Sequence, residues 1–502
     1  MKQIPSHRLE LSILVFIIFL YFILRLPNLT LQPIFADEAI YIRWAQVMRA
    51  EPSLRFLPLT DGKTPLFMWS MIPLLKIIED PLFAGRLLSV ISGFATLLGV
   101  IFLSWKVFGV KVAYFSALLV AITPYMVFFD RMALVDSMLA AFSIWALIFS
   151  VLLLSNLRLD LAMFLGYMFG GGLLTKTPAL VSILILPITL IGFDFKNRRK
   201  EFLKLLTLWV VAIVIALAMY NGLRLGPSFH MISLRNEDYV HSINEILKRP
   251  YDPFLPHFKD TIDYFVNFLT IPIFFILIYG TVHIISSRNK LGIVIFLWAI
   301  IPLIIQMAFL KTFTARYLLF SIPPLLILAG FGLEKIMQKL SIPRVPKKVS
   351  ITMILGVLAL VPMQFNISLI LNPEIAHLPK GERRGYLEDW TAGYGMKDIA
   401  QYLIEQKKNG SVVVGTEGYF GTLPDGLQIY LDKSEIPVIG GNAIISEKLR
   451  DSASDNQTFF IANKNRIIEE PSYLVKIKEY PKAKPSENYP QDAIMLYKVL
   501  PK

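Results

Sequence analysis

Long apolar runs recur along the first three quarters of the chain, separated by short polar or charged stretches. A run of roughly 18 or more apolar residues is long enough to cross a bilayer as a helix. The pattern therefore predicts a polytopic α-helical membrane protein with about eleven spans. The expected spans are residues 9–26, 82–105, 110–128, 134–154, 160–175, 178–193, 205–222, 266–286, 291–310, 317–333 and 350–370.

Two polar-flanked loops between these spans are unusually long, at residues 27–81 and 223–265. The first loop contains two short apolar stretches, around 39–50 and 65–78, which we expect to be helices lying in the membrane interface rather than crossing it. Residues 1–371 are therefore expected to form one transmembrane domain with two large outer loops.

The pattern changes at residues 372–502, where charged and polar residues occur throughout. Short apolar runs at 411–415, 459–461 and 493–497 are typical of strands, and 398–406 has helical spacing. Alternating helix and strand signals predict a small soluble α/β domain, and the segment is long enough to bury a core of its own.

Composition agrees with a membrane protein and excludes thiol chemistry. Of 502 residues, 55% are hydrophobic and none is cysteine, so a disulfide, a thiolate nucleophile and a zinc–thiolate site are all impossible. The net charge of +13 raises the question of nucleic-acid binding, but the basic residues gather in short inter-helix loops such as 106–111, 196–204 and 288–290. That distribution is the positive-inside signal. It predicts a cytoplasmic N-terminus, an extracytoplasmic C-terminal domain and no nucleic-acid partner, in the plasma (inner) membrane.

Two adjacent carboxylates, Asp37 and Glu38, follow the first span at the predicted outer face. Asp is a favoured helix N-cap, and Glu is favoured in a first helical turn, so a capping role explains both residues. A catalytic role for Asp37, with Glu38 in support, is the alternative. The residues alone leave both possibilities open.

Four cations, Lys63, Arg131, Lys176 and Arg316, lie at the same predicted outer face, against the positive-inside tendency. Lipid phosphates or the mere end of a span explain each one separately. Together they indicate an anionic substrate. Asp136 lies one turn into an apolar span, where a carboxylate is costly and usually paired or functional. Arg131 is its nearest candidate partner in the sequence, in a structural ion pair or a substrate-orienting network.

At these residues the chain resembles membrane glycosyltransferases of the GT-C fold, in particular the protein O-mannosyltransferase-like family and its aminoarabinose-transferase relatives. The resemblance covers about the first 330 residues. It rests on Asp37-Glu38, Gly62-Lys63-Thr64-Pro65-Leu66, Arg131 to Asp136, Leu174-Thr175-Lys176 and Arg316-Tyr317, in this order. Such enzymes transfer a sugar from a polyprenyl-phosphate carrier to an acceptor at the outer face.

The resemblance implies a role for each matched residue. Asp37 would be the general base, and Lys63 would hold the carrier phosphate. Arg131, Asp136, Lys176 and Tyr317 would lie in or near the donor cavity, with Arg316 beside them. One carboxylate suffices for a single inverting displacement, and fixed cations stabilise a phosphate leaving group. We therefore expect no metal and no cofactor, a lipid-linked sugar donor, membrane lipids as surroundings, and a protein, lipid or glycan acceptor that the sequence does not identify.

Two other classes of membrane protein remain possible from the sequence. Secondary transporters usually carry midplane polar residues on broken helices and have internal repeats, whereas here the charges gather at one interface. A polysaccharide polymerase or ligase also uses lipid-linked donors. Such an enzyme would place its site in a later outer loop, and residues 223–265 include Arg224, Arg235, His241 and Arg249.

Overall fold

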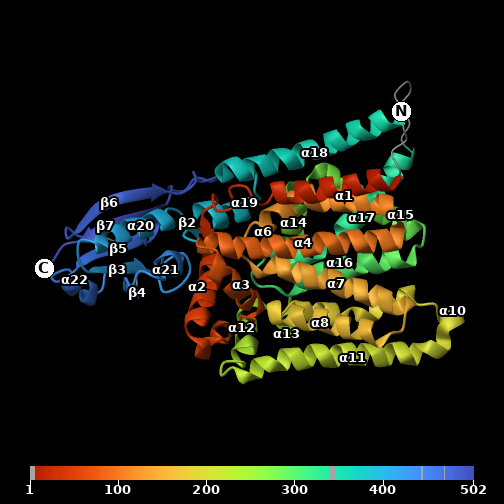
Figure 1. Ribbon diagram of the computed structural model, residues 1–502, viewed down its shortest axis with the longest axis horizontal. Helices are drawn as coiled ribbons and strands as arrows, with labels where there is room; N and C mark the ends of the chain where they lie inside the picture. Colours follow the sequence, from red (N-terminus) through yellow and green to blue (C-terminus); the bar gives the residue numbers. More distant parts are fainter. Residues whose placement is uncertain (1–5, 340–345, 442–444, 468–469, 502) are drawn as a thin grey trace.

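The computed structural model describes residues 6–339, 346–441, 445–467 and 470–501. Each predicted span is helical. The helices are α1 (Ser6–Ile23), α4 (Pro81–Phe108), α5 (Val110–Ile122) with α6 (Pro124–Asp130), α7 (Val135–Ser155), α8 (Leu159–Thr175), α9 (Ala179–Leu184) with η3 (Leu186–Gly192), α11 (Phe202–Asn221), α15 (Ile271–Ser286), α16 (Lys290–Phe309), η7 (Ala315–Ser321) with α17 (Ile322–Lys339), and α18 (Lys347–Leu371). They lie side by side in one bundle (Figure 1).

Fewer helices meet the length and hydropathy criteria for a membrane span than the eleven that the sequence predicts. Within the described residues, 6 helices are long and apolar enough to cross a membrane, or up to 8 if each bent helix pair is one span. The remaining predicted spans, 9–26, 160–175 and 178–193, correspond to apolar helices of only 10–17 residues. A polytopic helical membrane protein is confirmed, and the count of eleven stays a prediction.

Helix α17 lies at the centre of the bundle: in the segment Ala315–Lys339, which η7 and α17 form together, 94% of the most apolar stretch is buried. It packs against α15, α5 and α16. The contact with α15 is a close backbone approach: a Cβ at Gly280 would lie 2.2 Å from the carbonyl oxygen of Leu328. Small residues that allow such an approach are typical of helix interfaces in membranes.

The outer helices α11, α15 and α18 turn apolar side chains away from the protein. Val210, Val214, Phe275, Val357 and Leu360 are each 58–66% exposed. Such a large exposed apolar surface would be unfavourable in water, and it suits contact with lipid acyl chains.

The first predicted outer loop folds over one end of the bundle. Its elements are β1 (Ile34–Phe35), α2 (Ala36–Ala50), η1 (Pro52–Leu54), η2 (Leu57–Asp61) and α3 (Leu66–Ile77). Figure 1 shows α2 crossing the end of the bundle that faces the C-terminal domain. Both helices expected in this loop are thus present.

The second large loop contains η5 (Gly222–Leu225), α12 (Met231–Tyr239), α13 (Ile243–Lys248), α14 (Phe254–Tyr264) and η6 (Phe265–Leu269). Helix α12 packs against η2 of the first loop, so the two outer loops meet at the same end of the bundle. At the other end, α10 (Phe195–Arg198) and η4 (Arg199–Glu201) connect η3 to α11.

The C-terminal segment begins after α18 with η8 (Pro373–Ile375), α19 (Lys380–Arg383), η9 (Arg384–Glu388) and β2 (Ala392–Gly393). A five-stranded sheet of order β4-β3-β5-β7-β6 follows. The strands are β3 (Val412–Glu417), β4 (Val438–Gly441), β5 (Gln457–Asn463), β6 (Leu474–Pro481) and β7 (Ala493–Val499), and the helices are α20 (Met396–Lys407), α21 (Asp425–Leu431) and α22 (Glu447–Ser452). Strand β3 is parallel to β4 and β5, whereas β7 is antiparallel to its neighbours. The predicted α/β domain is confirmed.

The C-terminal domain is attached to the first outer loop as well as to α18. Strands β1 and β2 pair, with Ile34 opposite Gly393 and Phe35 opposite Ala392. Helix α21 packs against α2. The backbone just before Asp37 is therefore held by the C-terminal domain.

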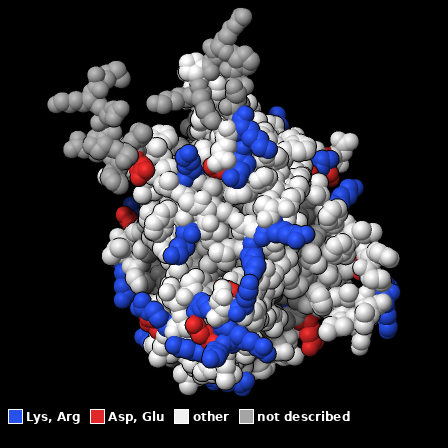
Figure 2. Space-filling model, turned by 90° about the vertical axis from the view of Figure 1, so that its right-hand side faces the viewer, with Lys and Arg blue, Asp and Glu red and all other residues white. Residues whose placement is uncertain are grey.

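The opposite end of the bundle presents basic residues. Figure 2 looks onto that end and shows Lys and Arg side chains spread over it and gathered toward its lower edge. The exposed Lys196, Arg199 and Lys200 of α10 and η4 belong to this end. This distribution agrees with the predicted cytoplasmic face, and the orientation itself stays a prediction.

Candidate active site

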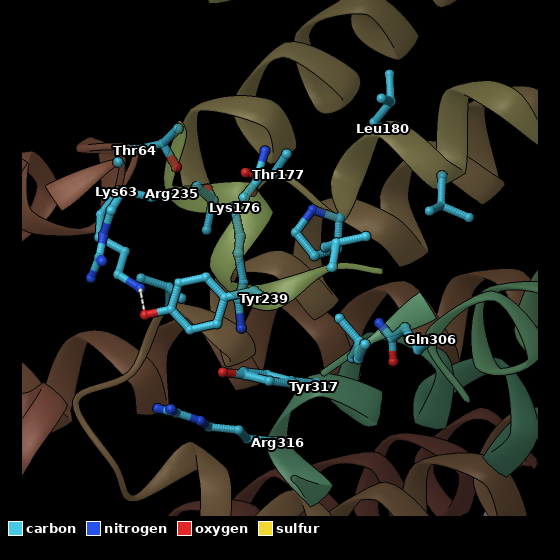
Figure 3. A pocket seen from close by; sticks show the side chains of 18 of the residues that line it. Lys63, Thr64, Lys176, Thr177, Leu180, Arg235, Tyr239, Gln306, Arg316 and Tyr317 are labelled. Atoms are coloured by element: carbon cyan, nitrogen blue, oxygen red, sulfur yellow. Dashed lines mark hydrogen bonds between the residues drawn. The ribbon is translucent and has the colours of Figure 1, made fainter. Parts of the chain in front are cut away.

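A cavity of about 410 Å³ lies where the two outer loops meet the bundle. Figure 3 shows its wall, which comes from the turn before α3, the α8–α9 junction, α12, α16 and η7. Its polar lining residues include Asp37, Asp61, Lys63, Thr64, Thr175, Lys176, Thr177, Arg235, Asn236, Tyr239, Gln306, Arg316 and Tyr317. Five predicted site residues, Asp37, Lys63, Lys176, Arg316 and Tyr317, thus line one cavity.

A tight turn places Lys63 in this wall. Gly62 ends η2 with φ +67°, and a Cβ there would lie 2.7 Å from the Cβ of Arg235. Glycine allows both the left-handed backbone and the close approach of α12. Lys63 Nζ then donates to the Tyr239 hydroxyl at 3.5 Å, and it lies 4.7 Å from the centre of that ring.

Lys176 is placed by the break between two helices. Helix α8 ends at Thr175, and Lys176 is extended, with φ −163° and ψ 139°. Pro178 follows, and the residues just before a proline disfavour continued helix. Lys176 Nζ lies 4.1 Å from the centre of the Tyr317 ring, on the wall formed by η7.

Asp37 is paired with Arg316, with 2.6 Å between Asp37 Oδ2 and an Arg316 guanidinium nitrogen. Asp37 lies in the first turn of α2, whose N-cap is Phe35, so the capping role considered from the sequence is not the one it has. Burial alone would raise the pKa of Asp37, but the charges of Arg316, Lys63 and Lys176 together hold that pKa below its usual value. The carboxylate is 29% exposed toward the cavity and is ionised at neutral pH.

Asp136 pairs with Lys176 rather than with Arg131, its nearest candidate partner in the sequence. Asp136 Oδ1 and Lys176 Nζ are 2.7 Å apart, and Asp136 is 3% exposed. The second oxygen of this carboxylate, Oδ2, has no hydrogen-bond partner. Asp136 thus fixes a cation of the cavity, because a buried carboxylate is stable only when paired.

Glu38 does not reach the cavity, in contrast to its predicted catalytic role. Its side chain is fully buried and forms an ion pair with Arg86 at 2.7 Å. It also accepts hydrogen bonds from the backbone N–H groups of Phe35 and Ala133. Glu38 therefore joins α2 to α4 and to the turn before α7, which is a structural role.

Arg131 is likewise buried, is hydrogen-bonded within the protein and does not line the cavity. It is 2% exposed, and its guanidinium donates to the backbone carbonyls of Arg25, Pro27 and Asn28 at 2.6–2.9 Å. These carbonyls follow the end of α1. Arg131 therefore holds the start of the first outer loop and is not placed to orient a substrate directly.

The remaining wall of the cavity is apolar and comes mainly from α9 and α16. Its side chains are Leu180, Val181, Leu184, Ile305, Phe309 and Leu310. Leu180 and Leu184 are 43% and 64% exposed, so this wall continues onto the outer surface of the bundle. A single cavity thus combines a cationic region with an apolar wall that reaches the lipid side.

The cavity also has polar lining residues that the sequence does not predict as site residues, among them Arg235, Tyr239 and Gln306. Arg235 and Tyr239 are four residues apart on α12 and share one helix face. In the sequence Arg235 is one of several basic residues of the 223–265 loop, and in the structure it pairs with Asp61 at 2.8 Å. Gln306 had no sequence signal, because an isolated Gln in an apolar span has many structural explanations.

Within the described residues, no group of three or more His, Asp or Glu side chains is arranged to hold a metal ion. Two described carboxylates line the cavity: Asp37, which is 29% exposed and pairs with Arg316, and Asp61, which is 37% exposed and pairs with Arg235. Of the two, Asp37 has its pKa lowered by the charges of Arg316, Lys63 and Lys176.

Comparison with known proteins relates this geometry to a family. Residues 62–221 match the family of dolichyl-phosphate-mannose-protein mannosyltransferases. Among curated proteins, no relative matches the chain. The family match agrees with the resemblance seen in the sequence and does not support the secondary-transporter alternative.

Solved structures share the fold. ArnT from Cupriavidus metallidurans in the apo state is 14% identical with a TM-score of 0.63, covering 99% of this chain and 98% of ArnT. The same protein bound to undecaprenyl phosphate is 16% identical with a TM-score of 0.61, covering 98% of each chain. The oligosaccharyltransferase AglB from Archaeoglobus fulgidus, with an inhibitory peptide and dolichol phosphate, is 13% identical with a TM-score of 0.53, covering 90% of this chain and 69% of AglB. The predicted GT-C fold is confirmed.

Proposed function

We propose that this chain, a membrane glycosyltransferase with a polyprenyl-phosphate sugar donor, transfers the sugar with inversion to an acceptor hydroxyl at the extracytoplasmic face, with Asp37 as general base. One observation carries the proposal: Asp37, Lys63, Lys176 and Arg316 line a single cavity whose other wall is apolar and reaches the lipid side. This arrangement suits a substrate with a phosphate at one end and an isoprenoid chain at the other.

The reaction is a single displacement. Asp37 accepts the proton of the acceptor hydroxyl, and the hydroxyl oxygen attacks the anomeric carbon from the face opposite the phosphate. The bond between the anomeric carbon and the phosphate oxygen breaks, and its electron pair leaves with the polyprenyl phosphate. The sugar passes through an oxocarbenium-like state. Lys63, Lys176 and Arg316 stabilise the negative charge that grows on the leaving phosphate.

Arg316 connects the base to the leaving group. It pairs with Asp37 in the structure and lies in the same lining as Lys63 and Lys176. A donor phosphate drawn to these cations competes with Asp37 for the charge of Arg316. Because that charge lowers the pKa of Asp37, its engagement by phosphate makes Asp37 a stronger base once the donor is bound.

The bilayer-facing wall explains how the carrier reaches the site. Leu180 and Leu184 lie on α9, and Phe309 lies on α16. An isoprenoid chain packed along these side chains stays in contact with apolar surface while its phosphate enters the cationic region. Lateral entry from the bilayer follows from this arrangement.

The base assignment is tested with membranes that contain the protein and undecaprenyl-phosphate mannose. The wild-type protein should release undecaprenyl phosphate, and Asp37→Asn should lower turnover about 10²- to 10⁴-fold because base catalysis is lost. Glu237→Gln is the matched control, since it neutralises an exposed carboxylate on α12 outside the cavity, and its turnover should stay within about twofold of wild type. Full turnover in a folded Asp37→Asn protein would end the assignment.

A further inference from the structure

Gln306 is a buried side chain in the cavity with no hydrogen-bond partner. It lies on α16 and is 4% exposed, and neither its amide nitrogen nor its amide oxygen has a partner. The other lining residues with an unpartnered buried polar atom are Thr64 and Arg235, among the residues that the structure describes. Gln306 is unpartnered at both of its polar atoms.

Packing does not account for this amide. Its neighbours along the cavity wall of α16, Ile305 and Phe309, are apolar, and a leucine has nearly the same volume as a glutamine. A buried polar group that is left unsatisfied destabilises the folded protein, because it loses its hydrogen bonds to water and gains none in return. An amide in this position is therefore best explained by a ligand that supplies its partners.

The chemistry of the amide identifies which part of a ligand it meets. The amide nitrogen donates and the amide oxygen accepts, so a partner that does both satisfies it best. A phosphate monoanion or dianion chiefly accepts, and Lys63, Lys176 and Arg316 already serve that role in the same cavity. An isoprenoid chain does neither. A hydroxyl group donates and accepts, and in a polyprenyl-phosphate sugar only the sugar carries hydroxyls.

The position of Gln306 agrees with this reading. In the view of Figure 3, Gln306 lies on the other side of Tyr239 and Tyr317 from Lys63, and its amide is turned toward the cavity. The cationic region and the unpartnered amide are thus separate parts of one lining. A ligand that fills both needs a phosphate and a second polar group.

We propose that Gln306 hydrogen-bonds a hydroxyl of the donor hexose and so determines which sugars the cavity accepts. This inference rests on the proposed function, because it takes the ligand to be a lipid-linked sugar. A site that hydrogen-bonds a substrate hydroxyl discriminates strongly against substrates that lack it. Gln306 is then a sugar-binding residue, distinct from the cations that hold the phosphate.

The test compares two probes, undecaprenyl-phosphate mannose and undecaprenyl phosphate, by their affinity for the full-length protein in phosphatidylcholine nanodiscs. Gln306→Leu should weaken binding of the mannose-bearing probe about 10- to 100-fold. Its affinity for undecaprenyl phosphate should stay within about twofold of wild type, because that probe carries no sugar. Phe309→Leu is the matched control on the same helix. It removes apolar wall and should weaken both probes alike.

Three outcomes would overturn the inference. They are equal weakening of both probes by Gln306→Leu, no change in either affinity, and a wild-type protein that binds undecaprenyl-phosphate mannose no more tightly than undecaprenyl phosphate. Thermal unfolding checks the variant, and Gln306→Met replaces it if the leucine protein does not fold. Failure of the proposed function looks different: the wild-type protein would bind the mannose probe with the predicted dependence on Gln306 and yet release no undecaprenyl phosphate.

Discussion

Neighbouring carboxylates in this chain have opposite environments. Asp37 faces the cavity and pairs with Arg316, whereas Glu38 points into the protein and pairs with Arg86. Successive residues on a helix are about 100° apart around its axis, so one of two adjacent side chains can be buried while the other is accessible. The pair Asp37-Glu38 therefore contains one candidate catalytic group and one structural group.

Arg316 should control the acidic limit of activity. With Asp37 as the proposed base, we expect activity to require the ionised carboxylate and to be lost as the pH falls through its pKa, which Arg316 helps to keep below its usual value. In Arg316→Gln the effect of burial remains and only the weaker opposing charges of Lys63 and Lys176 are left, so the pKa of Asp37 rises and the acid limb of the kcat/KM profile moves to higher pH. Arg316→Lys keeps the charge and should keep the limb nearly in place. An unchanged limb in Arg316→Gln would contradict the assignment of Asp37 as the base.

At the scale of elements, the C-terminal domain contacts the backbone just before each member of the Asp37–Arg316 ion pair. Strand β2 pairs with β1, just before Asp37. Glu382 of α19 accepts a hydrogen bond from the backbone N–H of Ala315, just before Arg316. The geometry of the candidate base thus depends on how this domain is attached to the bundle.

Asp432 provides a test of that attachment. At the end of α21 it accepts from Arg43 at 2.8 Å and from Arg49 at 2.7 Å, and both arginines lie on α2. Asp432→Ala removes the carboxylate that both cations share, and we expect a loss of about 1–2 kcal/mol of stability together with a several-fold drop in turnover. Affinity for undecaprenyl phosphate should change little. Glu435→Gln, which alters a carboxylate that is 91% exposed, should leave melting temperature and turnover unchanged; an equal effect of both variants would refute the docking role.

Glu382, which connects the C-terminal domain to η7, should make the stability of the protein depend on pH. Burial raises its pKa to about 7. The folded protein then binds a proton more tightly than the unfolded chain, so the stabilising contribution is complete below the unfolded pKa of about 4.3 and is lost as the pH rises through about 7. Stability should therefore decline between these limits, by up to about 1.4 kcal/mol per pH unit. In Glu382→Gln, the difference in melting temperature between pH 5 and pH 8 should shrink. An unchanged difference would show that Glu382 does not cause the pH dependence of stability.

At the scale of the whole molecule, the bundle separates a basic end from an end capped by the outer loops and the C-terminal domain. The start of α1 and the C-terminal domain lie at opposite ends of the bundle (Figure 1). A chain that starts at one end and finishes at the other crosses the bundle an odd number of times. This geometry agrees with the predicted cytoplasmic N-terminus and extracytoplasmic C-terminal domain.

The orientation is testable directly, because the chain contains no cysteine. Lys200→Cys lies at the basic end and Asn409→Cys lies in the C-terminal domain, and both native side chains are exposed. On intact spheroplasts, a membrane-impermeant maleimide should label Asn409→Cys and should reach Lys200→Cys only after lysis. Labelling of the two variants in the reverse order would invert the proposed topology and move the reaction to the cytoplasmic face.

The local pattern of the sequence determined the helices, the soluble α/β domain and the basic end of the bundle. Hydropathy, strand alternation and loop charge each depend on residues close together in the chain, so no knowledge of packing was needed.

Tertiary structure alone decided which charges face each other. The partner of Asp136 is Lys176, forty residues away in the chain. It is not Arg131, whose guanidinium donates instead to the backbone carbonyls that follow α1. Arg235, Tyr239 and Gln306 enter the cavity only because α12 packs against η2 of the first outer loop and α16 packs against η7 and α9. Ion pairs and cavity walls form between segments distant in the chain, and their energies depend on separation and burial, which a linear pattern does not contain.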